Sequence, residues 1–197
     1  MTRPLVLASA SPARLRLLRD AGFDPSVVVS GVDEAGFTGD EPRELVQELA
    51  HRKAAVVADG VSDGLVVGCD SMLLLGGELF GKPADAEDAL ARWKRMRGRT
   101  GTLLTGQVVV DAASGGTARG VGATSVRFGT PSDEEISAYV ASGEPLQVAG
   151  AFTLDGRSAP FIDGIDGDAG TVIGLSLPLL RTQLAGLGVR LTDLWAP

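Results

Sequence analysis

The sequence has 197 residues, of which 44% are hydrophobic, so it is long enough for one domain with a sizeable core. A net charge of −7 without a long basic block argues against a protein that grips nucleic acid through its phosphates. No apolar run approaches the roughly 18 residues of a membrane-spanning helix, and the four-residue run after Pro4 is too short for a signal peptide. We therefore expect no nucleic-acid or membrane partner. The single cysteine, Cys69, cannot form an internal disulfide, which favours the cytoplasm.

The first part of the chain predicts a strand, a helix, a strand and a helix, over residues 5–8, 11–22, 25–30 and 40–60. Ser11 followed by Pro12 is typical of an N-cap with proline at the first helical position, and Gly22 ends that helix. The second helix is expected to open at Asp40 and Pro42.

Lys53 shares a face of the second predicted helix with apolar residues at helical spacing, Leu45, Leu49 and Val56. We therefore expect its side chain to point inward. The alternative is that the aliphatic stem packs on apolar surface while the ammonium reaches water. The only histidine, His51, falls off this face and is expected at the surface.

The remaining chain predicts further strands at 65–75, 78–80, 101–111 and 117–128, and helices at 85–97, 132–143 and 176–187. The two long strands are expected to pair antiparallel through a glycine-rich turn, and residues 144–175 to form loops and short strands around a site. The tail at 191–197 is expected to be peripheral. No linker divides the chain, so we predict one α/β domain over residues 1–197, with a mixed sheet and flanking helices, an architecture that also allows two lobes with a central cleft.

Asp70 stands out because it lies inside an otherwise apolar predicted strand, where an ionised carboxylate is costly unless it is paired or needed. Other charged residues also occur where pattern or turn chemistry points inward, namely Arg14, Glu34, Lys53 and Lys82. A buried ion pair of Asp70 with Lys82 on adjacent strands is the simpler explanation. However, buried charges that gather together mark functional sites more often, and two carboxylates with several cations suit a divalent metal, a polyphosphate and an activated water.

The segment from Ser9 to Arg14 joins a strand end to a helix N-terminus, where free N–H groups and the helix dipole favour an anion. Two hydroxyl groups, of Ser9 and Ser11, and the guanidinium of Arg14 add donors. The alternative is that Ser11 only caps the helix. The chain has neither a Walker phosphate-binding loop nor a Rossmann glycine fingerprint.

Six spaced motifs resemble the successive signatures of the Maf family: LASASPAR at 7–14, GCDS at 68–71, GKP at 81–83, SDEEI at 132–136, GEPL at 143–146 and GLSLP at 174–178. The resemblance covers nearly the whole chain. It implies a nucleoside triphosphate pyrophosphatase related in fold to inosine triphosphate pyrophosphatase, with a divalent metal cofactor, Mg²⁺ or Mn²⁺, and a homodimeric assembly.

The resemblance also implies roles for individual residues. It makes Asp70, Glu34, Lys53 and Lys82 catalytic, with Glu34 and Asp70 as metal ligands, and it makes Ser9, Ser11 and Arg14 phosphate-binding. The expected reaction is metal-dependent hydrolysis of a nucleoside triphosphate to its monophosphate and pyrophosphate, which would clear noncanonical or modified nucleotides. The alternatives are a non-enzymatic protein that inhibits septum formation in cell division, the family's first association, and a phosphomonoesterase that releases orthophosphate.

Three substrate-binding positions depart from the family's subgroup specific for thymidine and uridine triphosphates. Ala13 stands where the family often has arginine, Ser71 where the subgroup has threonine, and Asp155 where it has glutamine. An ionised Asp155 only accepts hydrogen bonds and would favour a base edge rich in N–H donors, unless it turns outward or binds Arg157. The pyrimidine preference of that subgroup is therefore not expected here.

Overall fold

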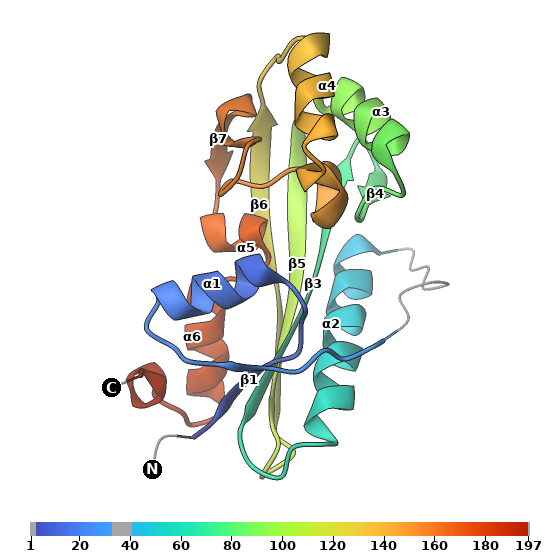
Figure 1. Ribbon diagram of the computed structural model, residues 1–197. Coiled ribbons are helices and arrows are strands. Elements are labelled where there is room, and N and C mark those ends of the chain that lie inside the picture. Colours follow the sequence, from blue (N-terminus) through green and yellow to red (C-terminus); the bar gives the residue numbers. More distant parts are fainter. Residues whose placement is uncertain (1–2, 33–40, 197) are drawn as a thin grey trace. The chain divides into compact units, whose positions relative to one another are not determined.

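The computed structural model describes residues 3–32 and 41–196, which form a seven-stranded mixed sheet with flanking helices (Figure 1). Its strand order is β2-β1-β3-β5-β6-β7, with β4 paired to β3. The strands are β1 (Leu5–Leu7), β2 (Ser26–Val27), β3 (Leu65–Leu75), β4 (Glu78–Phe80), β5 (Thr100–Asp111), β6 (Thr117–Phe128) and β7 (Ile162–Asp166). Strand β1 runs parallel to β2 and β3, whereas β4 is antiparallel to β3 and β7 to β6, so the predicted α/β class with a mixed sheet is confirmed.

Six α-helices and several short 3-10 helices complete the described part of the chain. The helices are α1 (Pro12–Asp20), α2 (Pro42–Ala58), α3 (Ala86–Met96), α4 (Asp133–Ala141), α5 (Ala169–Ile173) and α6 (Leu177–Gly186). The 3-10 turns are η1 (Glu144–Gln147), η2 (Ala149–Ala151), η3 (Ala159–Phe161) and η4 (Leu191–Leu194). As the sequence predicts, Ser11, Asp85, Ser132 and Ser176 are N-caps whose side chains accept a backbone N–H, and Ser132 forms a full capping box with Glu135.

The chain divides into two compact units, each assembled from segments far apart in sequence. Unit 1 comprises Met1–Asp70, Thr105–Gly122 and Gly174–Pro197, and unit 2 comprises Ser71–Leu104 and Ala123–Ile173. Strands β3, β5 and β6 contribute residues to both units. The central cleft expected from the sequence remains a prediction.

In unit 1, successive strand residues pack on opposite faces of the sheet. Leu7, Val67 and Cys69 belong to the core cluster that contains residues of α1 and α6, whereas Val6 and Val66 pack with α2. This alternation follows from the two-residue repeat of a strand. Helix α2 therefore lies on one face of these strands and α1 and α6 on the other (Figure 1).

Helix α2 packs backbone to backbone on the sheet because two strand glycines leave room for it. A Cβ on Gly68 of β3 would lie 2.4 Å from the carbonyl oxygen of Ala50, and one on Gly106 of β5 would lie 2.1 Å from that of Val46. Both distances are too short for any side chain. The close approach brings Lys53 of α2 within reach of β3.

Unit 2 is built around Trp93 of α3, which is fully buried. Its indole N–H donates to the carbonyl of Ala151 at 2.8 Å, and aromatic rings meet it edge to face, those of Phe128, Tyr139 and Phe161. Burial raises the pKa of Tyr139 above its usual range. Helix α4 buries Ile136, Tyr139 and Val140, as its sequence pattern predicts.

Several boundaries and exposures differ from the predictions. Strand β2 is limited to Ser26–Val27 and is shorter than the predicted 25–30, although the N–H of Val28 still donates to the carbonyl of Leu7 at 3.1 Å. Val56 is 52% exposed and Val57 takes its place on the buried face of α2, so the predicted apolar stripe is wrong at its last member. Helix α2 begins at Pro42, and the expected opening residue Asp40 lies outside the described residues.

Two parts of the chain expected at the surface, the C-terminal tail and His51, make tertiary contacts. Leu194 of the C-terminal tail is buried, and Trp195 forms a bridge with Phe23, so the tail is not peripheral. His51 is half-buried, with its Nε2 2.8 Å from Nη2 of Arg119.

Among the described helices, none is both long and apolar enough to cross a membrane.

Replacing Gly68 by alanine is expected to destabilise the protein by about 3 kcal/mol, because the new methyl group meets the main chain of α2 rather than a flexible side chain. Urea unfolding measures the loss. The matched control is Gly186→Ala in α6, where nothing lies within 4 Å of an added Cβ and alanine is the better helix former. Equal stability of Gly68→Ala and the wild type would contradict the close packing of α2.

Candidate functional site

The turn between β1 and α1 gathers hydroxyl groups at a helix N-terminus. Strand β1 is held to β3 up to Ala8, whose N–H donates to the carbonyl of Val67 at 2.8 Å. Ser9 then accepts the N–H of Ser11 at 3.2 Å, and Ser11 caps α1 by accepting the N–H of Arg14 at 3.4 Å. Pro12 at the first helical position fixes the entry of the helix. The predicted Ser9 and Ser11 therefore lie together at the N-terminal end of α1, where the helix dipole favours an anion.

Arg14 folds back from α1 onto this turn and onto β3. Its Nη1 donates to Oγ of Ser9 at 3.1 Å and to the carbonyl of Cys69 at 3.0 Å, and its Nε donates to the carbonyl of Gly174 at 2.8 Å. The side chain thus connects the Ser9 hydroxyl with the residue that precedes Asp70. Arg14 therefore lies beside Ser9, and its role in binding phosphate stays a prediction.

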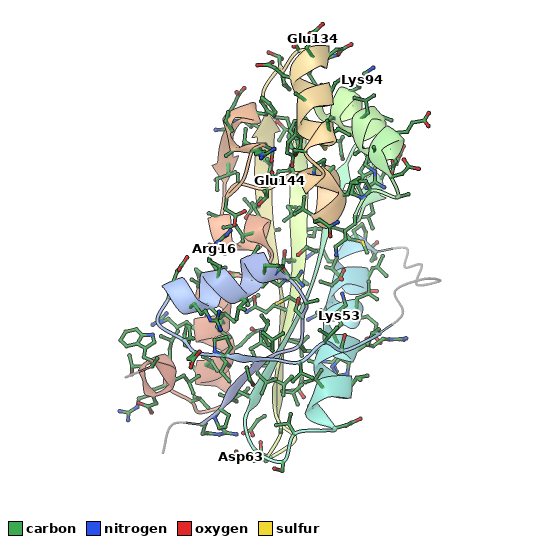
Figure 2. All side chains as sticks on the ribbon, viewed as in Figure 1. Arg16, Lys53, Asp63, Lys94, Glu134 and Glu144 are labelled. Carbon is green, nitrogen blue, oxygen red and sulfur yellow. The ribbon has the colours of Figure 1, made fainter. Side chains whose placement is uncertain are left out.

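Lys53 and Asp70 form a buried ion pair. Nζ of Lys53 lies 2.6 Å from Oδ1 of Asp70, and the two residues are 8% and 5% exposed. Lys53 comes from α2, where Figure 2 shows it labelled, and Asp70 from the middle of β3, inside the strand predicted over 65–75. The inward orientation predicted for Lys53 is confirmed, and the alternative in which its ammonium reaches water is wrong.

Both members of this ion pair, and the residue before Asp70, are removed from water. Cys69, next to Asp70, is fully buried, and desolvation raises the pKa of its thiol to about 11, so it is a strand residue and not a reactive thiolate. In such surroundings the mutual attraction of two charges only offsets the cost of removing them from water. A buried ion pair therefore contributes little to stability, and it more often indicates a functional site.

Three of the predicted site residues belong to unit 2. Ser71 follows Asp70 on β3 and is half-buried, and Lys82 is exposed just after β4. Asp155 is exposed and its carboxylate accepts the hydroxyl of Thr153. Within unit 1 the ammonium that pairs with Asp70 is that of Lys53, and the pairing of Asp70 with Lys82 stays a prediction.

The Asp155 segment is a tight, internally bonded loop. The buried Ser158 donates to the carbonyl of Thr153 at 2.8 Å and accepts its N–H at 2.9 Å. Arg157 contributes its main-chain N–H to Glu144, at 2.9 and 3.1 Å from the two carboxylate oxygens. The role of Asp155 in base choice stays a prediction.

The predicted metal ligands are Asp70 and Glu34, and Glu34 lies outside the described residues. In the described part of the chain no three acidic, histidine or cysteine residues form a metal-binding cluster. Asp70 with the nearby hydroxyl of Ser9 offers oxygen donors, which Mg²⁺ and Mn²⁺ prefer. Ala13, the remaining predicted substrate-binding residue, is half-buried in α1.

Sequence reasoning missed a second buried polar group beside the site, formed by Gln107, Ser176 and Gln183. Gln107 follows Thr105 and Gly106 and precedes three valines, which is a weaker signal than the one that singled out Asp70. Its amide bonds the main chain of Ser176, two residues after the carbonyl that holds Arg14. Because an amide is neutral, its burial in a strand indicates a functional site less clearly than a buried carboxylate does.

Proteins similar to this chain share one name. A family model described as Maf-like protein matches residues 4–187. A protein of Streptomyces coelicolor named nucleoside triphosphate pyrophosphatase is 66% identical over 197 residues, covering 99% of this chain and 96% of its own length. A protein of the same name from Streptomyces avermitilis is 64% identical, covering 99% of this chain and 96% of its own length. Another, from Thermosynechococcus vestitus, is 53% identical and covers 96% of this chain and 96% of its own length.

Replacing Lys53 by methionine is expected to cost about 3 kcal/mol of stability, because it removes the ammonium that faces a buried carboxylate. The double variant Lys53→Met/Asp70→Val removes both charges and should recover at least half of the loss. Urea unfolding of the two single variants and the double variant measures this coupling. Lys94→Met is the matched control, since its side chain is 47% exposed and only 4.0 Å from Asp133. Additive effects of the two site substitutions would contradict the ion pair.

Proposed function

The chain belongs to the Maf-like protein family, and from this premise we propose that it hydrolyses nucleoside triphosphates to a nucleoside monophosphate and pyrophosphate. The observation that carries the proposal is the buried pair of Lys53 and Asp70 one residue from the carbonyl that binds Arg14. Asp70 has the carboxylate needed to orient water, and the turn before α1 has the donors needed for phosphate. The substrates we propose are modified or noncanonical nucleotides.

In the proposed reaction, water attacks the anhydride between the α- and β-phosphates. One P–O bond forms, the bridging P–O bond breaks, and pyrophosphate leaves while the proton of the water passes to the carboxylate of Asp70. Lys53, Lys82 and Arg14 neutralise the negative charge that develops on the phosphate oxygens. Ser9, Ser11 and the N-terminus of α1 position the triphosphate.

A divalent cation, Mg²⁺ or Mn²⁺, fits the oxygen donors of the site. Such a cation is commonly held by one or two carboxylates together with substrate phosphates and water, and Asp70 with Glu34 would be those carboxylates. When bound, the cation supplies charge neutralisation and a lowered pKa for water. The pairing of Asp70 with Lys53 supports this arrangement, because it holds the carboxylate of Asp70 in a fixed position.

Base choice follows from Ala13, Ser71 and Asp155 in this proposal. The exposed carboxylate of Asp155 accepts hydrogen bonds, so guanine and cytosine, which offer several N–H donors on their pairing edges, are favoured over thymine and uracil. A homodimer and a cytoplasmic setting complete the proposal. They rest on the family resemblance and on the single, fully buried cysteine.

With a panel of nucleoside triphosphates and Mg²⁺ or Mn²⁺, we expect monophosphate and pyrophosphate in equal amounts, and no turnover once a chelator removes the metal. Chromatography of the nucleotides together with separate pyrophosphate and orthophosphate assays identifies the products. Orthophosphate with a diphosphate would indicate a different phosphatase, and no turnover of any nucleotide would favour the non-enzymatic role in septum formation. A preference of tenfold or more for dTTP or UTP would contradict the proposed base choice.

The variant Asp70→Asn is expected to lose at least about two decades of kcat, the usual contribution of a general base. Asparagine keeps an oxygen to face Nζ of Lys53, so the fold should remain, which circular dichroism and gel filtration check. Asp63→Asn makes the same chemical change at an exposed carboxylate and should leave kcat unchanged. If Asp70→Asn kept more than a tenth of the wild-type rate, Asp70 would be structural and the mechanism wrong.

A further inference from the structure

Gln107 is a fully buried amide in the middle of β5, between apolar strand neighbours. Burying an amide is costly unless all its hydrogen bonds are made. Oε1 of Gln107 accepts the N–H of Ser176 at 2.9 Å, and Nε2 donates to the carbonyl of Ser176 at 3.2 Å and to Oε1 of Gln183 at 2.9 Å. Gln107 thus binds both main-chain groups of Ser176, as a neighbouring strand would.

Gln183 of α6 completes the network from the other side. Its Nε2 donates to the main-chain carbonyl of Gln107 at 2.7 Å, while its Oε1 accepts from the Gln107 amide. Both amide hydrogens of Gln107 are therefore used, and a flipped amide would set its oxygen against two acceptors. Gln107 can hold Ser176 in one orientation only. In this network Gln183 bonds Gln107, and Gln107 alone of the two bonds Ser176.

The segment that Gln107 holds is the one that orients Arg14. Ser176 lies two residues after Gly174, whose carbonyl accepts Nε of Arg14 at 2.8 Å. Gly174 has a φ of +117°, and a Cβ there would lie 2.9 Å from the same Nε, so the guanidinium and this main chain are closely fitted. A shift of Ser176 would move the Gly174 carbonyl and release Nε.

Arg14 in turn touches two parts of the site through Nη1. It donates to Oγ of Ser9 in the turn before α1 and to the carbonyl of Cys69, which precedes Asp70 on β3. An uninterrupted series of short contacts therefore runs from Gln107 through Ser176 and Gly174 to Arg14 and Ser9, all within unit 1.

We propose that Gln107 is a positioning residue for the site: by fixing the main chain of Ser176 it places the Gly174 carbonyl that orients the guanidinium of Arg14 beside Ser9. The consequence for substrate rests on the proposed function, in which Arg14 and Ser9 bind the triphosphate. Loss of Gln107 leaves Asp70 and Lys53 in place but loosens this phosphate subsite. Its effect is therefore on substrate affinity, unlike a loss of folded protein, which lowers the apparent kcat alone.

The first experiment observes Arg14 directly and needs no activity. In ¹⁵N-labelled protein, the Nε–H resonance of Arg14 is assigned by its absence in Arg14→Lys, and its exchange with solvent is measured by NMR. Gln107→Met, which keeps the length of the side chain without its polar atoms, should speed this exchange at least about tenfold, as for an unbonded donor. Gln183→Met, the same change at the supporting glutamine, should alter it less than twofold.

The second experiment measures kinetics on the best nucleotide of the panel. Gln107→Met should raise KM about tenfold, the scale of removing an outer support of a ligand, with kcat changed less than threefold, whereas Gln183→Met should leave KM unchanged. In the Arg14→Lys background, Gln107→Met should add less than twofold to KM, since both act on the same contact. If Gln107→Met does not fold, Gln107→Asn, which keeps the amide but is one methylene shorter and so cannot make the same bonds to Ser176, takes its place with the same expectations.

Unchanged Arg14 exchange in a folded Gln107 variant, or an equal response to Gln183→Met, would overturn the inference. Faster exchange with unchanged KM would also overturn it, because Arg14 would then move without consequence for substrate. A wild-type protein without activity on any nucleotide would overturn the proposed function alone, and the exchange measurement would still decide whether Gln107 positions Arg14.

Discussion

The close approach of α2 to the sheet is the constraint on which the site depends. Gly68 and Gly106 remove side chains from two neighbouring strands, so the helix main chain rests on the strand main chain. Only at that distance can Nζ of Lys53 reach Oδ1 of Asp70 in the middle of β3. A wider separation filled by ordinary side chains would leave a buried carboxylate without this ammonium. The glycines are thus part of the site, although neither carries a functional group.

The other face of the same strands supplies the anion-binding half. There α1 starts at Pro12, directly after the turn that β1 enters, and Arg14 bends back to join Ser9 with the carbonyl of Cys69. Because β1 and β3 are adjacent and parallel, the turn after β1 and the residue Asp70 lie at neighbouring points of the sheet. The parallel pairing of β1 with β3 therefore places the carboxylate of Asp70 on β3 near the N-terminus of α1, which follows β1. This combination of an ionised acid with oriented donors is what hydrolysis of a charged anhydride requires.

The sequence predicted the elements well and the partners less well. Strand β3, the hairpin to β4, the capped helices α1, α3, α4 and α6, and the inward orientation of Lys53 all follow from periodicity and capping chemistry, which are local. The partner of Asp70 within unit 1 is Lys53, which approaches from a helix 17 residues earlier in the chain, and local pattern does not identify such a contact. Val56 and Trp195 were misjudged for a related reason: helical phase and tail packing are settled by the tertiary neighbours and not by local pattern.

The role of Gln107 illustrates a type of residue that local pattern marks without explaining. A polar side chain in a buried strand must be bonded, and this requirement can be read from sequence. The groups that bond it cannot be read from sequence, because Ser176 and Gln183 lie 69 and 76 residues away along the chain. Once the partners are known, the physical consequence is definite: an amide that makes both main-chain bonds to Ser176 acts as a substitute strand and stiffens the segment on which Arg14 depends. Charged residues supply the chemistry of this site, but neutral ones, two glycines and a glutamine, determine where those charges stand.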